Sequence, residues 1–123
     1  MHHPYLFIAA ISGFITVALG AFGAHALKNL LTGPMLDVYK TAVNYQMWHT
    51  LLLALVALLP PQPLLNWAAR LLVAGIALFS GSLYLLAVFN IPWLGMITPL
   101  GGLAFLGAWA LLACAAWRQK SAK

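Results

Sequence analysis

Four long apolar runs occupy most of this chain, and short proline-containing segments separate them. The runs lie at about residues 4–27, 42–60, 66–89 and 92–117. A helix needs about 20 apolar residues to cross the hydrocarbon core of a bilayer, so each run is long enough to span it. Charged residues are expensive in that environment, and the whole chain holds a single acidic residue, Asp37. The sequence therefore predicts an all-α membrane protein, a four-helix transmembrane bundle that forms one domain over residues 1–123.

The composition excludes several broad classes of protein. Hydrophobic residues make up 64% of the chain and charged residues 6%, a balance that cannot cover the surface of a soluble globular domain. The formal charge of +5 comes from scattered or terminal cations, and the tail of Arg118, Lys120 and Lys123 suits a contact with anionic lipid headgroups. We therefore expect the lipid bilayer as the main partner and no nucleic acid. The lone Cys114 excludes a disulfide or a thiolate zinc site within one chain.

A helix start precedes the second run. Thr32 or Gly33 suits the cap of a helix whose first position is Pro34, and Asp37 in the first turn suits the helix dipole. Apolar residues then alternate with polar ones up to about residue 43, as on a helix that lies at a membrane surface. This segment is predicted to be either a short interfacial helix or an extension of the second span.

Charges and aromatic residues predict how the four spans are oriented. An even number of spans places both termini on one side, together with Arg70 and the basic tail, whereas Lys28 and Lys40 fall on the other side. The positive-inside rule then predicts that both termini are cytoplasmic. Two belts of interfacial aromatic residues are expected in this register: Tyr5, Trp67 and Trp117 at one interface, and Tyr39, Tyr45, Trp48 and Trp93 at the other.

Small residues recur at four-residue spacing on three of the runs, as in the pair Ala77 and Gly81. In lipid, helices associate through close backbone approach, because the hydrophobic effect does not drive one helix against another. We therefore predict tight packing within the bundle, and the same faces suit a homo-oligomer or a larger membrane complex. The glycines expected to serve this packing are Gly13, Gly20, Gly23, Gly81, Gly101 and Gly102.

Polar residues gather in one half of the predicted bundle, and the other half is almost wholly apolar. Residues three or four apart share a helix face, which applies to Tyr45, Gln46 and His49 and to the pair Ser80 and Tyr84. Ionisable residues inside a membrane are candidates for a functional site, so the two histidines are the main candidates. The predicted cluster consists of His25, Tyr45, Gln46, His49, Ser80, Ser82, Tyr84 and Thr98.

Two interpretations of this cluster remain open. The first is structural: each histidine bonds a hydroxyl or a carbonyl of a neighbouring helix and stabilises packing by about 1 kcal/mol. The second is a ligand site, in which His25 and His49 hold a haem iron or another metal, or in which His, Tyr and Ser side chains hold a quinone headgroup. The structural interpretation implies no cofactor.

Catalysis and proton-coupled export are both disfavoured. A nucleophilic Ser80 or Ser82 would need a histidine oriented by an acid, and the single acid of the chain lies outside the spans. Proton-coupled export requires a carboxylate inside the membrane, which none of the four runs contains. We therefore expect a protein that is not an enzyme.

Five sequence blocks in a fixed order resemble a known family. They are AISGF at 10–14, ALGAFGAH at 18–25, the YQ and HT pairs within 45–50, FSGSLY at 79–84 and TPLGG at 98–102. The chain resembles the YgdD-like inner-membrane family, a domain of unknown function (423) that is similar to transmembrane protein 256. The resemblance implies a four-helix integral protein of the bacterial inner (plasma) membrane and supplies no activity. We predict a small structural or accessory membrane protein that acts through helix–helix association.

Overall fold

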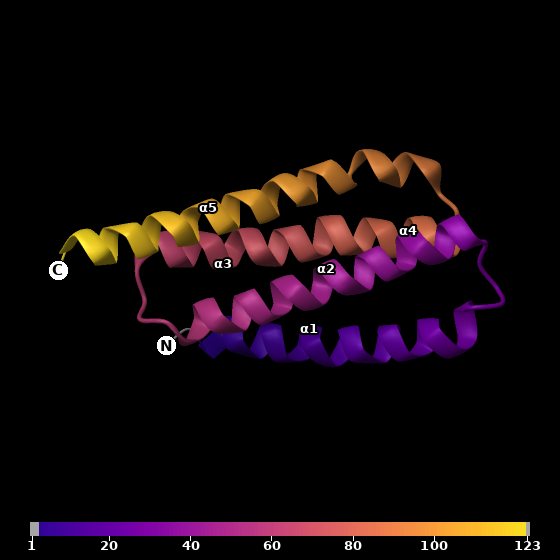
Figure 1. Cartoon of the computed structure of the whole chain (residues 1–123), viewed down its shortest axis with the longest axis horizontal. Coiled ribbons are helices and arrows are strands. Elements are labelled where there is room, and N and C mark those ends of the chain that lie inside the picture. Colours follow the sequence, from indigo (N-terminus) through magenta and orange to yellow (C-terminus); the bar gives the residue numbers. More distant parts are fainter. Residues whose placement is uncertain (1–2, 123) are drawn as a thin grey trace.

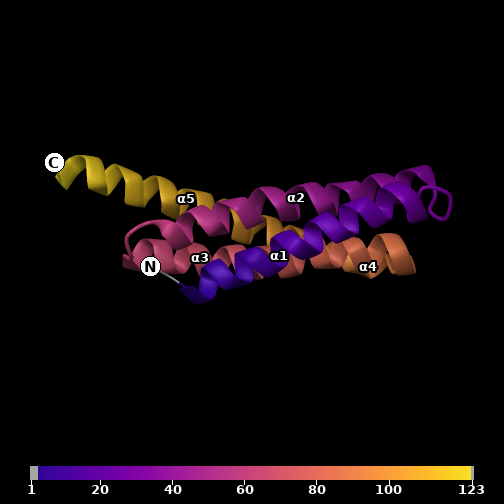
Figure 2. The ribbon, with the colours of Figure 1, turned by 90° about the horizontal axis from the view of Figure 1, so that it is seen from below.

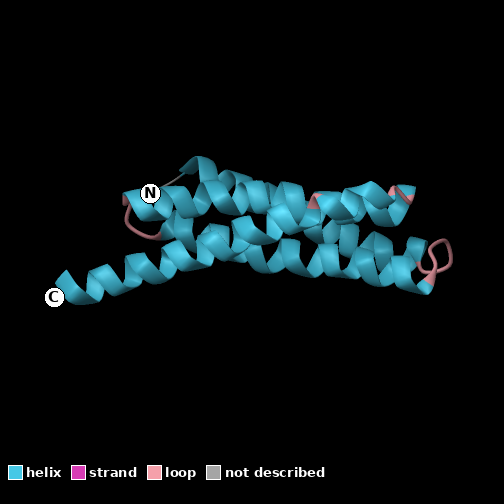
Figure 3. Cartoon of the chain, turned by 90° about the horizontal axis from the view of Figure 1, so that it is seen from above, coloured by secondary structure: helices cyan, strands magenta, loops and turns pink. Residues whose placement is uncertain are grey.

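The computed structural model describes residues 3–122, and all secondary structure in that range is helical (Figures 1 and 3). Lys123 of the predicted basic tail lies outside the described residues, and so does the side chain of Lys120. The elements are α1 (His3–Phe22), the π-helical turn η1 (Gly23–Leu27), α2 (Gly33–Leu58), α3 (Pro63–Gly75), the π-helical segment η2 (Ile76–Ser80), α4 (Gly81–Phe89), the 3₁₀ helix η3 (Pro92–Met96) and α5 (Thr98–Ala122).

These elements form four long helical rods, because η1 continues α1 and because α3, η2 and α4 follow one another without a break. Neighbouring rods are antiparallel, and both described ends of the chain lie at the same end of the molecule (Figures 1 and 2). The rods pack in chain order: α1 on α2, α2 on the α3–α4 rod, and α5 on α3 and η2. The second and third rods are therefore the inner ones, with α1 and α5 outside.

Local sequence signals account for the ends of the rods. The Thr32 hydroxyl caps α2 by accepting a hydrogen bond from the amide of Met35 at 3.3 Å, and Pro34 occupies the first turn. From there α2 runs unbroken to Leu58, so the segment before the predicted second span is an extension of that helix and not a separate one. Asn90 ends α4 in the left-handed region, with a φ of 52°.

Three rods are long and apolar enough to cross a membrane: Pro4–Leu27, Pro63–Phe89 and Pro92–Gln119. They match the first, third and fourth predicted runs. The remaining rod, α2, is 26 residues long but carries Asp37 and Lys40 in its first two turns and Gln46 near its middle, which lowers its mean hydropathy. The structure thus confirms an all-helical protein with several apolar spans.

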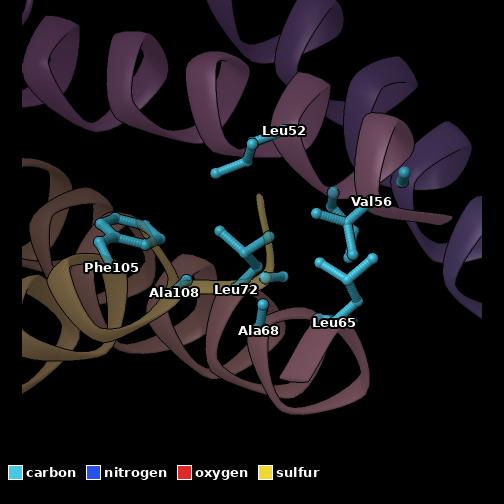
Figure 4. Close-up of a cluster of buried hydrophobic side chains, with 11 residues drawn as sticks. Leu52, Val56, Leu65, Ala68, Leu72, Phe105 and Ala108 are labelled. Atoms are coloured by element: carbon cyan, nitrogen blue, oxygen red, sulfur yellow. The ribbon is translucent and has the colours of Figure 1, made fainter. Parts of the chain in front are cut away.

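The apolar core lies where α2, α3 and α5 meet. Figure 4 shows Leu52 and Val56 of α2 facing Leu65 and Leu72 of α3, with Ala108 of α5 beside them. Ala108, Leu72 and Leu53 have no exposed surface. Small residues such as Ala68 let α5 approach α3 closely, as tight helix packing in lipid requires.

The predicted aromatic belts need one correction. Tyr45 and Trp48 are near the middle of the 26-residue α2, away from both of its ends, where residues of an interfacial belt are expected. Trp93, in contrast, lies in η3 at the end of its rod, and Trp67 lies in the first turns of α3 with Arg70 stacked over its ring at 4.8 Å. The two mid-helix aromatic residues line a groove instead.

Candidate functional site

A network of buried polar side chains joins α1, α2 and α4. The Ser12 and Thr50 hydroxyls lie 2.7 Å apart, and the Gln46 amide donates to the Ser12 hydroxyl at 3.2 Å. The Tyr84 hydroxyl donates to the other end of Gln46 at 2.6 Å. Gln46 therefore connects three helices. The sequence analysis did not predict Ser12 as a partner. The signal was its spacing of four residues from Thr16, which indicates a polar face on α1. In the structure the Thr16 hydroxyl donates to the Ser12 carbonyl.

Tyr39 extends this region toward the loop end of the bundle. Its hydroxyl donates to the Leu19 carbonyl of α1, and its ring meets the Tyr84 ring edge-on with centroids 5.4 Å apart. The ring packs directly on Gly23 of η1, where a Cβ would lie 2.3 Å from the nearest ring carbon. Only glycine leaves room for Tyr39 at this contact.

Two further hydrogen bonds of hydroxyl groups link helices of the bundle. The Ser80 hydroxyl donates to the Ala42 carbonyl of α2 at 2.9 Å, and the Ser82 and Thr98 hydroxyls lie 2.6 Å apart between α4 and α5. In a bilayer each such bond satisfies a polar group that cannot form a hydrogen bond to water. The predicted polar residues therefore form separate interhelical contacts and do not surround one cavity.

His49 of α2 is buried and faces α5. Its Nδ1 lies 2.8 Å from the Tyr45 carbonyl, and the Trp109 indole donates to its Nε2 at 3.1 Å. A carbonyl only accepts and an indole only donates, so the imidazole is neutral with its hydrogen on Nδ1. The Phe105 ring stacks on the imidazole at a centroid distance of 3.6 Å. Both ring nitrogens are thus engaged, and no lone pair is left for a metal.

His25 lies far from this position. It is exposed in η1, 13 residues after Ser12 along the first rod, whereas His49 is adjacent to Thr50, the partner of Ser12. At 1.5 Å per residue the two imidazoles are separated by about 20 Å along the bundle. Among residues 3–122 no group of three His, Cys, Asp or Glu side chains gathers in metal-binding geometry. The described residues do not form the His25–His49 ligand pair.

The six glycines expected to serve packing differ in their surroundings. Gly23 and Gly101 are required by close contacts: a Cβ on Gly101 would lie 2.3 Å from the backbone nitrogen of Phe79. Gly13 and Gly20 face α2 at ordinary contact distance, and Gly102 barely touches Phe79. A Cβ on Gly81 would meet nothing within 4 Å. Gly75, which packs against the Phe105 ring, was not predicted.

A groove of about 920 Å³ lies along the contact between α2 and α5, with Phe79 of η2 at its floor. The α5 helix packs on α3 and η2 and leaves this side open at the surface of the bundle. The spacing of Phe105 and Trp109, four residues apart on one face of α5, was a signal in the sequence that the prediction did not use. The groove is lined by Tyr45, Trp48, His49, Leu51, Phe79, Pro99, Gly102, Leu103, Phe105, Leu106 and Trp109.

Comparison with known proteins identifies the family. A family model described as "Protein of unknown function (DUF423)" matches residues 19–102, which include Gln46, Thr50 and Tyr84 of the buried polar network. The chain belongs to this family. The UPF0382 membrane protein YwdK of Bacillus subtilis is 44% identical over 116 residues, which cover 91% of this chain and 94% of the relative.

Two further relatives agree with this assignment. The UPF0382 inner membrane protein YgdD of Escherichia coli K12 is 42% identical over 118 residues, covering 94% of this chain and 90% of the relative. The UPF0382 membrane protein SH2409 of Staphylococcus haemolyticus is 42% identical over 110 residues, covering 88% and 90%. No solved structure matches the chain significantly. The resemblance drawn from the sequence is confirmed, and the chain is a membrane protein of a family without an assigned activity.

Proposed function

We propose that this protein spans the bacterial inner membrane four times, with both termini in the cytoplasm, and acts as an accessory protein that self-associates through the outer face of its α3–α4 rod. The observation that carries the proposal is which pairs of small residues are exposed and which are packed inside the fold. On this rod the pair Ala77 and Gly81 faces away from every other helix of the chain.

On the other rods, at least one small residue of each repeated pair contacts another helix of the chain. On α1, Ala9 is buried, and a Cβ placed on Gly13 would lie 3.7 Å from the Thr50 side chain, so this face packs against α2. On α5, Ala108 is buried against α3. Ala77 is exposed, Gly81 has open space around its missing side chain, and Leu85 continues the same apolar face one turn on. A pair of small residues facing lipid suits close approach of another helix.

The polar groups of the candidate cluster support an accessory role over a catalytic one. Gln46, Ser80 and His49 each bond another rod of the same chain, and these contacts account for their burial. Such hydrogen bonds hold helices together in lipid.

Length and charge support the four-span topology. The 26 residues of α2 extend about 39 Å at 1.5 Å per residue, which exceeds the hydrocarbon thickness of about 30 Å. The excess of about 9 Å corresponds to about six residues at the N-terminal end of α2, so Asp37 falls in the headgroup region and Lys40 lies at its boundary. The rod ends near the termini carry Arg70 and Arg118, whereas the opposite end carries Lys28 and Lys40 offset by Asp37. The positive-inside rule favours cytoplasmic termini.

The self-association test compares two substitutions of the same kind. Gly81→Leu fills the open face of the α3–α4 rod, and Ala110→Leu adds bulk to an exposed position on α5. Energy transfer between donor- and acceptor-labelled copies in phosphatidylglycerol vesicles reports association. We expect wild type and Ala110→Leu to transfer energy at a low ratio of protein to lipid. Gly81→Leu should require a ratio at least tenfold higher for the same transfer. Equal transfer in all three proteins would contradict the proposed face.

The topology test uses reporter fusions. Green fluorescent protein at the C-terminus and in the loop at residues 60–62 should fluoresce, and alkaline phosphatase inserted at residue 31 should be active, because that enzyme folds only outside the cytoplasm. Phosphatase activity from the 60–62 position would show that α2 does not cross the membrane.

A further inference from the structure

We propose that the groove between α2 and α5 is a binding site for a lipid-phase quinone, that is, a planar ring with two carbonyl oxygens and an apolar tail. The volume of about 920 Å³ lies within the range of sites for small ligands. This site is independent of the proposed self-association face, because neither Ala77 nor Gly81 lines the groove.

The groove is accessible from the bilayer. Trp48 is 55% exposed, Leu103 64% and Leu106 67%, so large apolar side chains at the rim face the acyl chains. The groove lies beside the middle of α2, at the depth of the hydrocarbon. A molecule that reaches this site must therefore arrive laterally, dissolved in the membrane, and its tail must be apolar.

The walls of the groove are flat rings that touch one another. Phe79 lies at the floor, with its centroid 4.6 Å from that of Tyr45 and 5.5 Å from that of Phe105. His49 stacks on Phe105 at 3.6 Å and receives the hydrogen bond from Trp109, which holds both α5 rings in place. Phe105 and His49 cover each other, and the rings open to a ligand are those of Trp48 and Trp109, which are 55% and 47% exposed. Such exposed ring faces favour a planar π system over a branched alkyl group.

The polar groups that remain free at the groove are donors. Tyr45 and Trp48 make ring contacts only, and neither the Tyr45 hydroxyl nor the Trp48 indole nitrogen donates to any residue within 3–122. A donor without a partner in hydrocarbon is costly, so a ligand with acceptor oxygens satisfies it. No lysine or arginine lines the groove, so the complementary oxygens belong to a neutral group. Quinone carbonyls fit this requirement, and carboxylate or phosphate headgroups do not.

The test measures binding of decylubiquinone to the full chain in phosphatidylcholine nanodiscs. A quinone next to an indole quenches its fluorescence, and Trp48 and Trp109 both line the groove. We expect saturable quenching by the wild-type protein. Gly102→Leu fills the groove, and a side chain there meets Phe79 only at ordinary contact distance, so this variant should fold and lose the saturable component. Tyr45→Phe removes one hydroxyl and should weaken binding about tenfold.

Three controls make the result decisive. Trp67→Phe, at the end of α3, and Ala110→Leu, outside the groove, should both keep the wild-type midpoint. Circular dichroism and thermal midpoints establish that Gly102→Leu is folded. Linear quenching in wild type, or equal saturable quenching in wild type and Gly102→Leu, would overturn the site. Displacement of the quinone by an equal amount of hexadecane would overturn the ring-specific part, since it would assign the groove to alkyl chains.

Discussion

The indole nitrogen of Trp109 donates to Nε2 of His49 at 3.1 Å, joining α5 to α2 across 60 residues of sequence. The opposite nitrogen of the same imidazole bonds the Tyr45 carbonyl, one turn earlier on α2. These two bonds fix the orientation of the ring on which Phe105 stacks. His49 thus provides one polar attachment of an outer rod whose main packing is on a different helix, α3.

Replacing His49 should weaken the attachment of α5. His49→Ala leaves a void beside Phe105 and removes the acceptor of Trp109, and we expect a loss of about 2 kcal/mol in the free energy of unfolding. Titration with sodium dodecyl sulfate in mixed micelles, followed by circular dichroism, measures this quantity. The matched variant His25→Ala changes an exposed residue and should stay within about 0.5 kcal/mol of wild type. An equal effect of both variants would contradict this role for His49.

Replacing Gln46 should loosen the junction of α1, α2 and α4. Gln46→Leu removes the acceptor of Tyr84 and the donor to Ser12, at an expected cost of about 1–2 kcal/mol. Asn44→Leu, an exposed position on the same helix, is the control.

A double-mutant cycle isolates one bond of this junction. Tyr84→Phe and Gln46→Leu should show a coupling energy of about 0.5 kcal/mol or more, because each removes the same hydrogen bond. Strictly additive losses in detergent unfolding would show that the Tyr84 hydroxyl does not depend on Gln46 for stability.

Two glycine-to-alanine substitutions should have opposite signs. Gly101→Ala places a methyl group against the backbone of Phe79, which cannot move aside as a flexible side chain would, and should cost about 1–3 kcal/mol. Gly81→Ala meets open space in a helix and should raise stability by up to about 1 kcal/mol through helix propensity. Unfolding midpoints measured side by side decide the matter, and a stabilised Gly101→Ala would show that α5 and η2 are not in close contact.

Gly23→Ala should disturb the loop end of the bundle by displacing the Tyr39 ring. The ring would move away from Leu19 and Tyr84 together, and we expect a loss of about 1–3 kcal/mol. Gly33→Ala, where nothing lies within 4 Å, is the matched control. Hydrogen exchange localises the effect: the amides of η1 and of the first turns of α2 should exchange faster in Gly23→Ala, while those around Leu72 stay protected. Unchanged exchange would count against the contact.

Much of the fold could be predicted because local chemistry decides it. Pro34, Pro63 and Pro92 each stand within the first turn of a helical element, where the missing amide hydrogen costs nothing. The limit appeared at α2, whose charged first turns left open whether it was one helix or two. Continuous packing of its length against α1 and α4 keeps it unbroken.

The candidate site could be predicted only in part. The residue types were found, but their grouping was not, because α2 has neighbours on several sides. Gln46 and His49 are three residues apart, yet Gln46 turns toward α1 and α4 and His49 toward α5. Helical spacing gives the angle between two side chains and does not say which rod lies at each angle.

The sequence by itself determined that the protein lies in a membrane, which segments are helical and where the connections fall. These features depend on apolar length, prolines and charges, which act within a few residues of one another. The tertiary structure decided which polar groups meet. The partners of Gln46, Ser80 and His49 on other helices stand 34 to 60 residues away in the sequence. Their pairing depends on which rods are inner and which outer, and packing along the whole length of each helix sets that order. The groove between α2 and α5 exists for the same reason: α5 packs on α3 and η2 and leaves the aromatic side of α2 uncovered.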